Sequence, residues 1–139
     1  MESSIHRAGV SWSGGEGEDV QAHEVLLGGQ TLPSSSALEL GGDDFKSNPE
    51  TLLVGALSSC HMLWFLALAR KKGFEVASYE DDADGVLDGK RFASATLRPR
   101  VRWAGEPPGP DAIEALHQRS HELCFISNSV DFPVSVEPG

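Results

Sequence analysis

The chain has 139 residues, which is long enough for one domain with a core of its own. Its 21 acidic residues outnumber 11 basic ones and give a net charge of −10, which argues against a nucleic-acid surface, because such a surface needs clustered positive charge. The N-terminal segment MESSIHRAGVSW has no apolar run behind a basic segment, so no export signal is expected. We therefore expect a single domain, residues 1–139, in the cytoplasm.

The first third of the chain has the pattern of short strands joined by glycine turns. Strands are expected at Val10–Trp12, at Val20–Leu27 and around Thr31, because Gly14-Gly15 and Gly28-Gly29 between them are hairpin signals. Residues 33–47 are rich in Ser, Gly and Asp without periodicity, which predicts a connecting loop.

A long helix is predicted from Asn48 to Gly73. Asn48 can cap its start, Pro49 suits the first helical position, and Glu50 complements the positive end of the helix dipole. Three basic residues, 70–72, favour the negative end, and Gly73 can adopt the left-handed conformation that stops a helix.

This helix is apolar on every side, with 14 apolar residues among the 18 of residues 52–69. Polar residues at its centre and capping signals near both ends argue against a membrane span, so no membrane association is expected. At roughly 36 Å it is as long as a small domain is wide, and it must be covered on all sides. A second copy of the chain is the simplest cover, and we expect a homodimer.

The remaining sequence predicts strands, one helix and a final strand. Residues 74–79 have a strand pattern, 81–89 an acidic turn pattern, and 93–103 alternate with period two. Within this last segment an arginine row could bind an anion, but a solvated outer face is expected. The row consists of Arg98, Arg100 and Arg102. A helix over 111–125 and a strand over 130–136 complete an α+β pattern with mostly antiparallel pairing.

Two cysteines, Cys60 and Cys124, are the first candidates for chemistry. In a reducing compartment a permanent disulfide is disfavoured, which leaves a redox pair, a metal site or two core residues. As a redox pair, one thiolate would attack and the second thiol would capture the resulting sulfenic acid.

Histidines keep the other two interpretations open. His117, His121 and Cys124 fall on one helical face, and Cys60 or His61 could complete a zinc-type set of ligands. Alternatively the cysteines are small core residues and the histidines form ordinary hydrogen bonds.

Two motifs carry a resemblance to a known family. The run NPETLLVGALSSCHML, residues 48–63, resembles the cysteine-bearing helix of the OsmC/Ohr superfamily, and CFISNSV, residues 124–130, is similar to the segment around that family's second cysteine. The segments YEDDADGV and LRPRV extend the similarity, which covers the chain from about residue 48 to its end.

The resemblance implies a cysteine-based peroxidase that reduces organic hydroperoxides without metal or organic cofactor. Cys60 would attack the peroxide, Cys124 would form a disulfide with it, and a dithiol such as a lipoylated protein would restore both thiols. Glu50 would orient an arginine beside the thiolate. The implied fold is an intertwined α+β homodimer with antiparallel sheets wrapped around the long helix and active sites between subunits. The alternative is a noncatalytic member of the fold that binds a small apolar ligand or a metal at the Cys/His cluster.

Two features of the sequence bear on this implied site. Glu50 precedes Cys60 by ten residues, about 15 Å along one helix, so we expect the glutamate of a site to come from the other subunit. No arginine lies in residues 10–49, where the family's catalytic arginine is found; Arg7 and Lys46 are the only basic candidates by position, and lysine lacks the planar fork. A structural role for His61 remains as open as a catalytic one.

Overall fold

The computed structural model describes residues 2–139. The chain forms two compact units, Met1–Leu52 and Leu53–Gly139, and each is described by itself. The single domain expected over residues 1–139 stays a prediction.

The first unit contains a three-stranded antiparallel sheet in the order β1-β2-β3. Its strands are β1 (Ala8–Ser11), β2 (His23–Leu27) and β3 (Gln30–Ser34). The hairpin predicted at Gly28-Gly29 is confirmed: both glycines have positive φ, +52° and +83°, which a two-residue hairpin turn of this kind requires. The predicted loop over 33–47 is wrong in part, because it begins with the end of β3 and contains a short 3-10 helix, η1 (Leu38–Leu40).

The long helix α1 (Pro49–Lys71) begins and ends where its signals predicted. Asn48 Oδ1 accepts the Thr51 N–H at 2.9 Å, and Thr51 Oγ1 accepts the Asn48 N–H at 3.1 Å, so the cap is reciprocal. At the other end Gly73 has φ +82°, and the Phe74 N–H donates to the Ala69 carbonyl at 3.0 Å, which closes the last turn.

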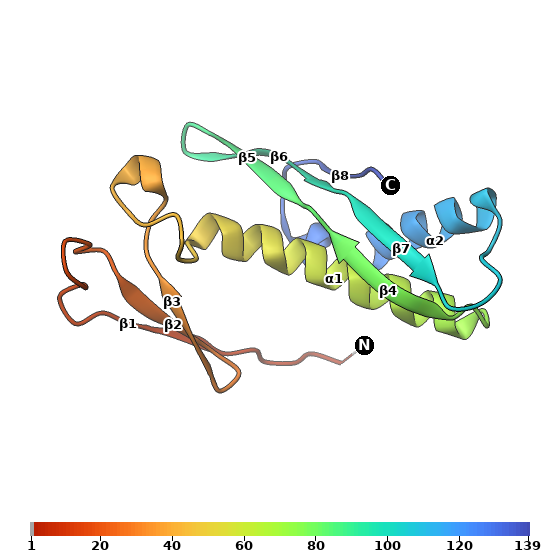
Figure 1. The fold of residues 1–139 in the computed structure, drawn as a ribbon, viewed down its shortest axis with the longest axis horizontal. Helices are drawn as coiled ribbons and strands as arrows, with labels where there is room; N and C mark the ends of the chain where they lie inside the picture. The colour runs from red at the N-terminus through yellow and green to blue at the C-terminus, as the bar shows by residue number, and fades with distance from the viewer. Residues whose placement is uncertain (1) are drawn as a thin grey trace. The chain divides into compact units, whose positions relative to one another are not determined.

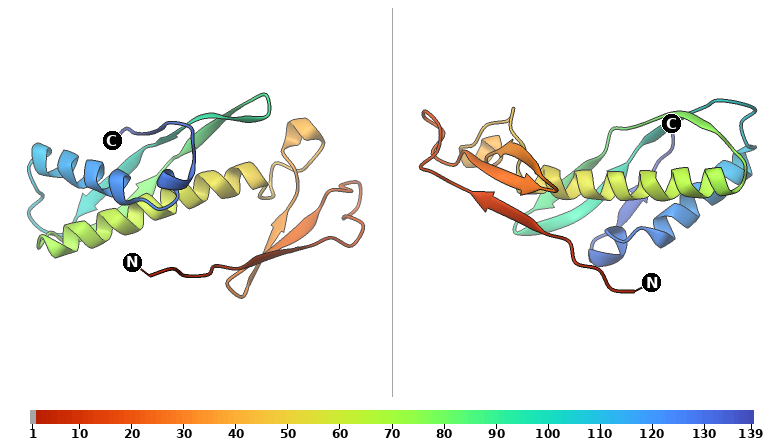
Figure 2. Two further views of the ribbon diagram at one scale, coloured as in Figure 1. Left: turned by 180° about the vertical axis from the view of Figure 1, so that it is seen from behind. Right: turned by 90° about the horizontal axis from the view of Figure 1, so that it is seen from below.

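The second unit places two small sheets and a second helix around α1 (Figure 1). The antiparallel pair β4 (Val76–Asp81) and β7 (Pro99–Trp103) forms one sheet. The other has the order β5-β6-β8, and β6 pairs in parallel with β8. Its strands are β5 (Asp84–Asp88), β6 (Arg91–Leu97) and β8 (Val134–Val136). The second helix, α2 (Pro110–Leu123), lies along the C-terminal half of α1 and is followed by the 3-10 helix η2 (Ser127–Ser129) (Figure 2).

Three predictions about this unit are wrong in detail. The acidic segment 81–89, predicted as a turn region, contains strand β5 at Asp84–Asp88, because pairing with β6 overrides the low strand propensity of its aspartates. The expected single strand over 93–103 is broken at Arg98 into β6 and β7, which belong to different sheets. The last strand begins only at Val134, because η2 and Pro133 come before it.

Asp81 holds the chain at the break between β6 and β7. Its Oδ1 accepts the Arg98 N–H at 2.6 Å, and its Oδ2 accepts the hydroxyl of Ser58, on α1, at 2.5 Å. One carboxylate therefore fastens the strand break to the helix, two residues before Cys60.

One stripe of α1 is buried inside the unit. Leu57, His61, Phe65 and Ala69 recur every four residues and are all but inaccessible. Leu57 packs with Ala95 and Leu97 of β6, and Phe65 and Ala69 pack with Leu116 of α2. Among the described residues α1 is the one helix long and apolar enough to span a membrane, by length and composition only, and its buried stripe contacts strands and α2 as a core helix does.

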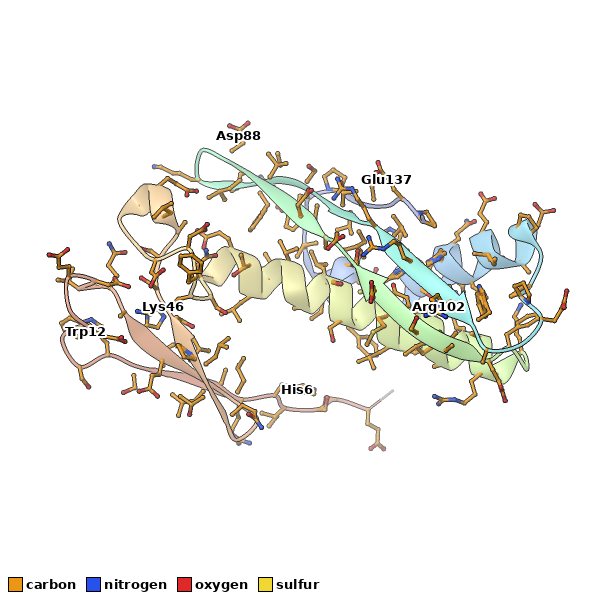
Figure 3. The ribbon with its side chains drawn as sticks, viewed as in Figure 1. His6, Trp12, Lys46, Asp88, Arg102 and Glu137 are labelled. Atoms are coloured by element: carbon orange, nitrogen blue, oxygen red, sulfur yellow. The ribbon has the colours of Figure 1, made fainter. Side chains whose placement is uncertain are left out.

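The arginine row is a solvated, ion-paired face, as expected. Arg98 pairs with Asp84 at 2.7 Å and Arg100 with Asp82 at 2.9 Å, all with substantially exposed side chains. Arg102, on β7, is also exposed (Figure 3). Two of the three arginines that could have bound an anion are therefore already ion-paired with acidic side chains on the same face.

We expect Asn48→Ala to lower the free energy of unfolding by about 1 kcal/mol, because the Thr51 N–H loses its acceptor at the helix start. Asn48→Asp, which keeps an acceptor and adds a charge that suits the helix dipole, is the matched control and should stay near the wild-type value. Chemical denaturation at one fixed protein concentration measures both. Equal losses in the two variants would contradict a capping role.

Candidate functional site: a cysteine pair beside a histidine pair

The structure brings Cys60 and Cys124 together. Cys60 lies at the middle of α1 and is half-buried, whereas Cys124 follows the last residue of α2 and is 1% exposed. Both thiols are free, and Cys60 lies near enough to Cys124 to help raise the pKa of its thiol. Residues far apart in the sequence thus form one dithiol within the second unit.

The two sulfurs have different environments. Burial raises the pKa of Cys124 to about 11, and the hydrogen bond with Cys60 acts in the same direction, against the N–H that Ser127 donates to the Cys124 sulfur at 3.3 Å. Cys124 therefore keeps its proton at neutral pH. Cys60 is the more accessible sulfur and has a thiol donor beside it.

An aromatic residue follows each cysteine in the sequence, and the two aromatic rings are in contact. Trp64, one helical turn after Cys60, meets Phe125, which follows Cys124, edge to face with ring centroids 5.5 Å apart. The contact joins α1 to the segment after α2.

His61 and His117 form a buried pair next to the dithiol. Nε2 of His61 lies 3.0 Å from Nδ1 of His117, and the rings stack with an interplanar angle of 5°. His117 also stacks on Phe65, with centroids 4.3 Å apart. The side chains are 1% and 4% exposed, so this pair belongs to the core that joins α1 to α2.

Both imidazoles are held neutral. Burial lowers the pKa of His61 to about 4, with further lowering from His117 and His121, and burial lowers the pKa of His117 to about 4. Neither ring can offer the positive charge that would stabilise a nearby thiolate at neutral pH. Nδ1 of His61 is buried without a hydrogen-bond partner in the described part of the chain.

The metal site considered from the sequence is not assembled. Among residues 2–139, no three His, Cys, Asp or Glu side chains come together in a group able to hold a metal ion. Nδ1 of His117 is already engaged by His61, and Nδ1 of His121 lies 3.5 Å from Ser127 Oγ. The shared helical face of His117, His121 and Cys124 therefore does not produce convergent ligands.

Glu50, Lys46 and Arg7 lie in the first unit. Glu50 is half-buried in the first turn of α1, and because the helix is continuous to Lys71, it lies about 15 Å along the axis from Cys60. Arg7 is exposed just before β1.

Lys46 forms ion pairs with acidic side chains of its own unit (Figure 3). Its Nζ lies 3.6 Å from Glu16, 3.5 Å from Asp19 and 3.7 Å from Asp43. Burial opposes its charge, but these carboxylates prevail and raise the pKa of Lys46. It is a structural cation of the N-terminal loops, and this makes it a weak replacement for a catalytic arginine.

Sequence reasoning missed the role of Ser127 and the pairing of His61 with His117. Ser127 follows a cysteine by three residues, and His61 and His117 are separated by 56 positions. The one signal in the sequence was a histidine in the buried stripe of an apolar helix, since such a residue requires a polar partner.

The fold and the site define a class of protein: an α+β protein whose long apolar helix carries a half-buried cysteine against a second, buried cysteine. Residues 41–138 match the family model described as OsmC-like protein, so the chain belongs to the OsmC-like family. No match is found among curated protein sequences.

Solved structures agree with this assignment. An OsmC-like protein of unknown function from Vibrio cholerae is 32% identical, with 99% of this chain and 100% of that chain covered and a TM-score of 0.89. An organic hydroperoxide resistance protein OsmC from Legionella pneumophila is 21% identical, with 97% and 99% covered and a TM-score of 0.67. The organic hydroperoxide resistance protein OhrB of Bacillus subtilis is 18% identical, with 98% and 100% covered and a TM-score of 0.66. The last two likenesses show the fold alone.

The histidine pair predicts a loss of stability in acid. The unfolded chain binds protons at imidazoles near pH 6.5, whereas the folded pair resists protonation until about pH 4, so the free energy of unfolding falls as pH falls through this window. After allowance for partial solvent screening, we expect a loss on the order of 2 kcal/mol from the pair.

Denaturation measured at several pH values between 6.5 and 4 tests this. The double variant His61→Leu/His117→Leu, which removes both titrating groups, should have a shallower acid slope, while His6→Gln, at an exposed histidine, should keep the wild-type slope. Identical slopes in all three proteins would show that the pair is protonated in the folded state.

Proposed function

We propose that the protein is a thiol peroxidase that reduces organic hydroperoxides in the cytoplasm. The observation that carries the proposal is the proximity of a half-buried Cys60 and a buried Cys124 in an OsmC-like fold. The organic hydroperoxide resistance proteins among its structural neighbours support the same substrate class.

The asymmetry of the dithiol supports a different role for each cysteine. Cys60 is the more accessible cysteine and lies near the buried Cys124 thiol, so its sulfur is the nucleophile that attacks the terminal oxygen of the peroxide. The O–O bond breaks, the alkoxide takes a proton and leaves as the alcohol, and Cys60 becomes a sulfenic acid. Cys124 keeps its proton until this point because burial raises its pKa.

The second thiol then completes the oxidation. Cys124 sulfur attacks the sulfenic sulfur, the S–O bond breaks, and water leaves as the Cys60–Cys124 disulfide forms. An external dithiol, for which a lipoylated protein is the proposed source, returns both cysteines to thiols and is itself oxidised to a disulfide. Each turnover thus consumes one hydroperoxide and one dithiol, and yields one alcohol, one water and one disulfide.

No hydrogen bond or ion pair of residues 2–139 joins an arginine to Cys60, and this limits the expected rate. The histidine pair is neutral, Lys46 is held by three carboxylates, and Arg98 and Arg100 are paired with acids on the outer face. Stabilisation of the Cys60 anion therefore falls to the thiol hydrogen of Cys124. A single weak donor stabilises an anion less than a guanidinium does, so we propose a slow peroxidase.

Thiol counting after mixing the reduced protein with tert-butyl hydroperoxide tests the roles. The wild-type chain should lose two thiols and release one alcohol. Cys60→Ser should lose none, and Cys124→Ser should lose one and gain the mass of one or more oxygen atoms at Cys60, because no thiol is left to capture the sulfenic acid. Thiol loss in Cys60→Ser, or full cycling of Cys124→Ser with a dithiol, would refute these assignments.

A homodimer is part of the proposal, and the uncovered face of α1 supports it. Opposite the buried stripe lie Gly55, Ser59, Leu63 and Ala67, all exposed, with Leu63 at 59%. Small residues around one leucine allow a second helix to approach closely. In such a dimer of antiparallel helices, Glu50 of one chain would approach Cys60 of the other.

We expect Leu63→Lys to shift the protein toward the monomer, because burial of a lysine between apolar helices leaves its charge unpaired. Leu87→Lys, at a leucine of β5 that is 46% exposed, is the matched control and should leave the mass unchanged. Light scattering coupled to size exclusion reads both. A monomeric wild type, or a Leu63→Lys variant with the wild-type mass, would argue against this interface.

A further inference from the structure

The second unit also contains a cavity that is separate from the dithiol. It encloses about 790 Å³ between α2, the end of β7 and the C-terminal strand β8, and all its lining residues fall within 103–138. This volume is within the range of small-molecule sites. Neither Cys60 nor Cys124 lines it, so the peroxidase proposal does not account for it.

The walls of this cavity are rigid and apolar. Trp103, at the end of β7, lines it, as do Ile113 of α2 and Val134 and Val136 of β8. Four prolines complete the wall: Pro107, Pro108, Pro110 and Pro138. Proline and tryptophan rings present flat surfaces that lose little conformational entropy when a ligand binds, and flat surfaces favour a planar, aromatic ligand.

His117 supplies a polar contact in this apolar cavity. Its side chain is 4% exposed and lines the cavity, and its Nδ1 is engaged by His61. Its second nitrogen, Nε2, forms no hydrogen bond among the described residues and is not one of their buried unpartnered atoms, which are His61 Nδ1 and the Tyr79 hydroxyl. The pairing with His61 thus leaves one ring nitrogen of His117 for a ligand.

The charges around the cavity select a neutral ligand. His117 carries no charge at neutral pH, Glu114 contributes a carboxylate to the lining, and the whole chain has a net charge of −10. An anionic ligand would meet repulsion without a cation to offset it. A hydroxyl group suits Nε2 in either tautomer of His117, because a hydroxyl both donates and accepts.

We propose that the cavity between α2, β7 and β8 binds a neutral aromatic molecule carrying a hydroxyl group, with the rings against Trp103 and the prolines and the hydroxyl on His117 Nε2. The site stands apart from the dithiol but close to it: His121 also lines the cavity and lies 3.5 Å from Ser127 Oγ, and Ser127 donates its N–H to the Cys124 sulfur.

Isothermal titration of the full chain with 2-naphthol tests the proposal, with naphthalene-2-carboxylate as the anionic probe of the same ring system. We expect one naphthol per chain and binding of the carboxylate weaker by about tenfold or more. Glu114→Gln should narrow that difference without changing the affinity for naphthol. Failure of naphthol to bind, or equal binding of the two probes, would overturn the proposal.

Two substitutions on α2 locate the binding. Ile113→Trp fills the cavity and should abolish naphthol binding, while Ala115→Trp, on the exposed side of the same helix and outside the lining, should leave it unchanged. For both variants, light scattering checks the mass of the assembly and circular dichroism checks the fold. If Ile113→Trp instead changes the mass of the assembly and naphthol does not bind to the wild type, the cavity is covered by a second copy of the chain and the proposal fails.

The role of His117 has its own readout. His117→Phe keeps a ring against Phe65 but has no nitrogen for the hydroxyl, so naphthol affinity should fall about tenfold, toward that of naphthalene lacking the hydroxyl. Unchanged naphthol affinity in a folded His117→Phe would refute the assigned contact. Cys60→Ser, which removes the peroxidase nucleophile, should bind naphthol as the wild type does, so the two proposals fail or stand independently.

Discussion

The hydrogen bond between His61 and His117 is the interaction on which the second unit depends. It ties the buried stripe of α1 to α2 at a point where both helices are otherwise apolar. Because a buried imidazole without a partner is costly, the bond fixes the two helices in one register rather than allowing them to slide. That register brings the end of α2, and with it Cys124, to the middle of α1.

Neutrality of this pair shapes the chemistry around it. A protonated imidazole one residue from Cys60 would stabilise a thiolate, but burial keeps both rings uncharged. The same burial keeps the proton on Cys124. The two thiols therefore differ only in position and burial: Cys60 is accessible, and Cys124 is buried and protonated. Most reactive thiol sites instead rely on a nearby cation.

Local signals in the sequence were sufficient for α1 but not for its surroundings. The reciprocal cap of Asn48 and Thr51 and the left-handed Gly73 are interactions between near neighbours, so both helix ends could be predicted. Strand β5 could not, because six of the nine residues in 81–89 are aspartates or glycines of low strand propensity, and residues 84–88 become a strand only through pairing with β6. The break at Arg98 likewise depends on Asp81, 17 positions earlier in the chain.

The candidate site divides in the same way. Cys60 and Cys124 were predicted because their motifs resemble a family, and the structure places the two thiols near each other. The hydrogen bond of Ser127 and the pairing of His61 with His117 were not predicted, because they depend on distances that only the packed helices establish. The unusual feature of the chain is thus the combination of a family dithiol with neutral surroundings. If the thiolate lacks a cation of its own chain, either the reaction is slow or a charge comes from outside the chain, and the exposed face of α1 beside Cys60 is where a second chain would bring it.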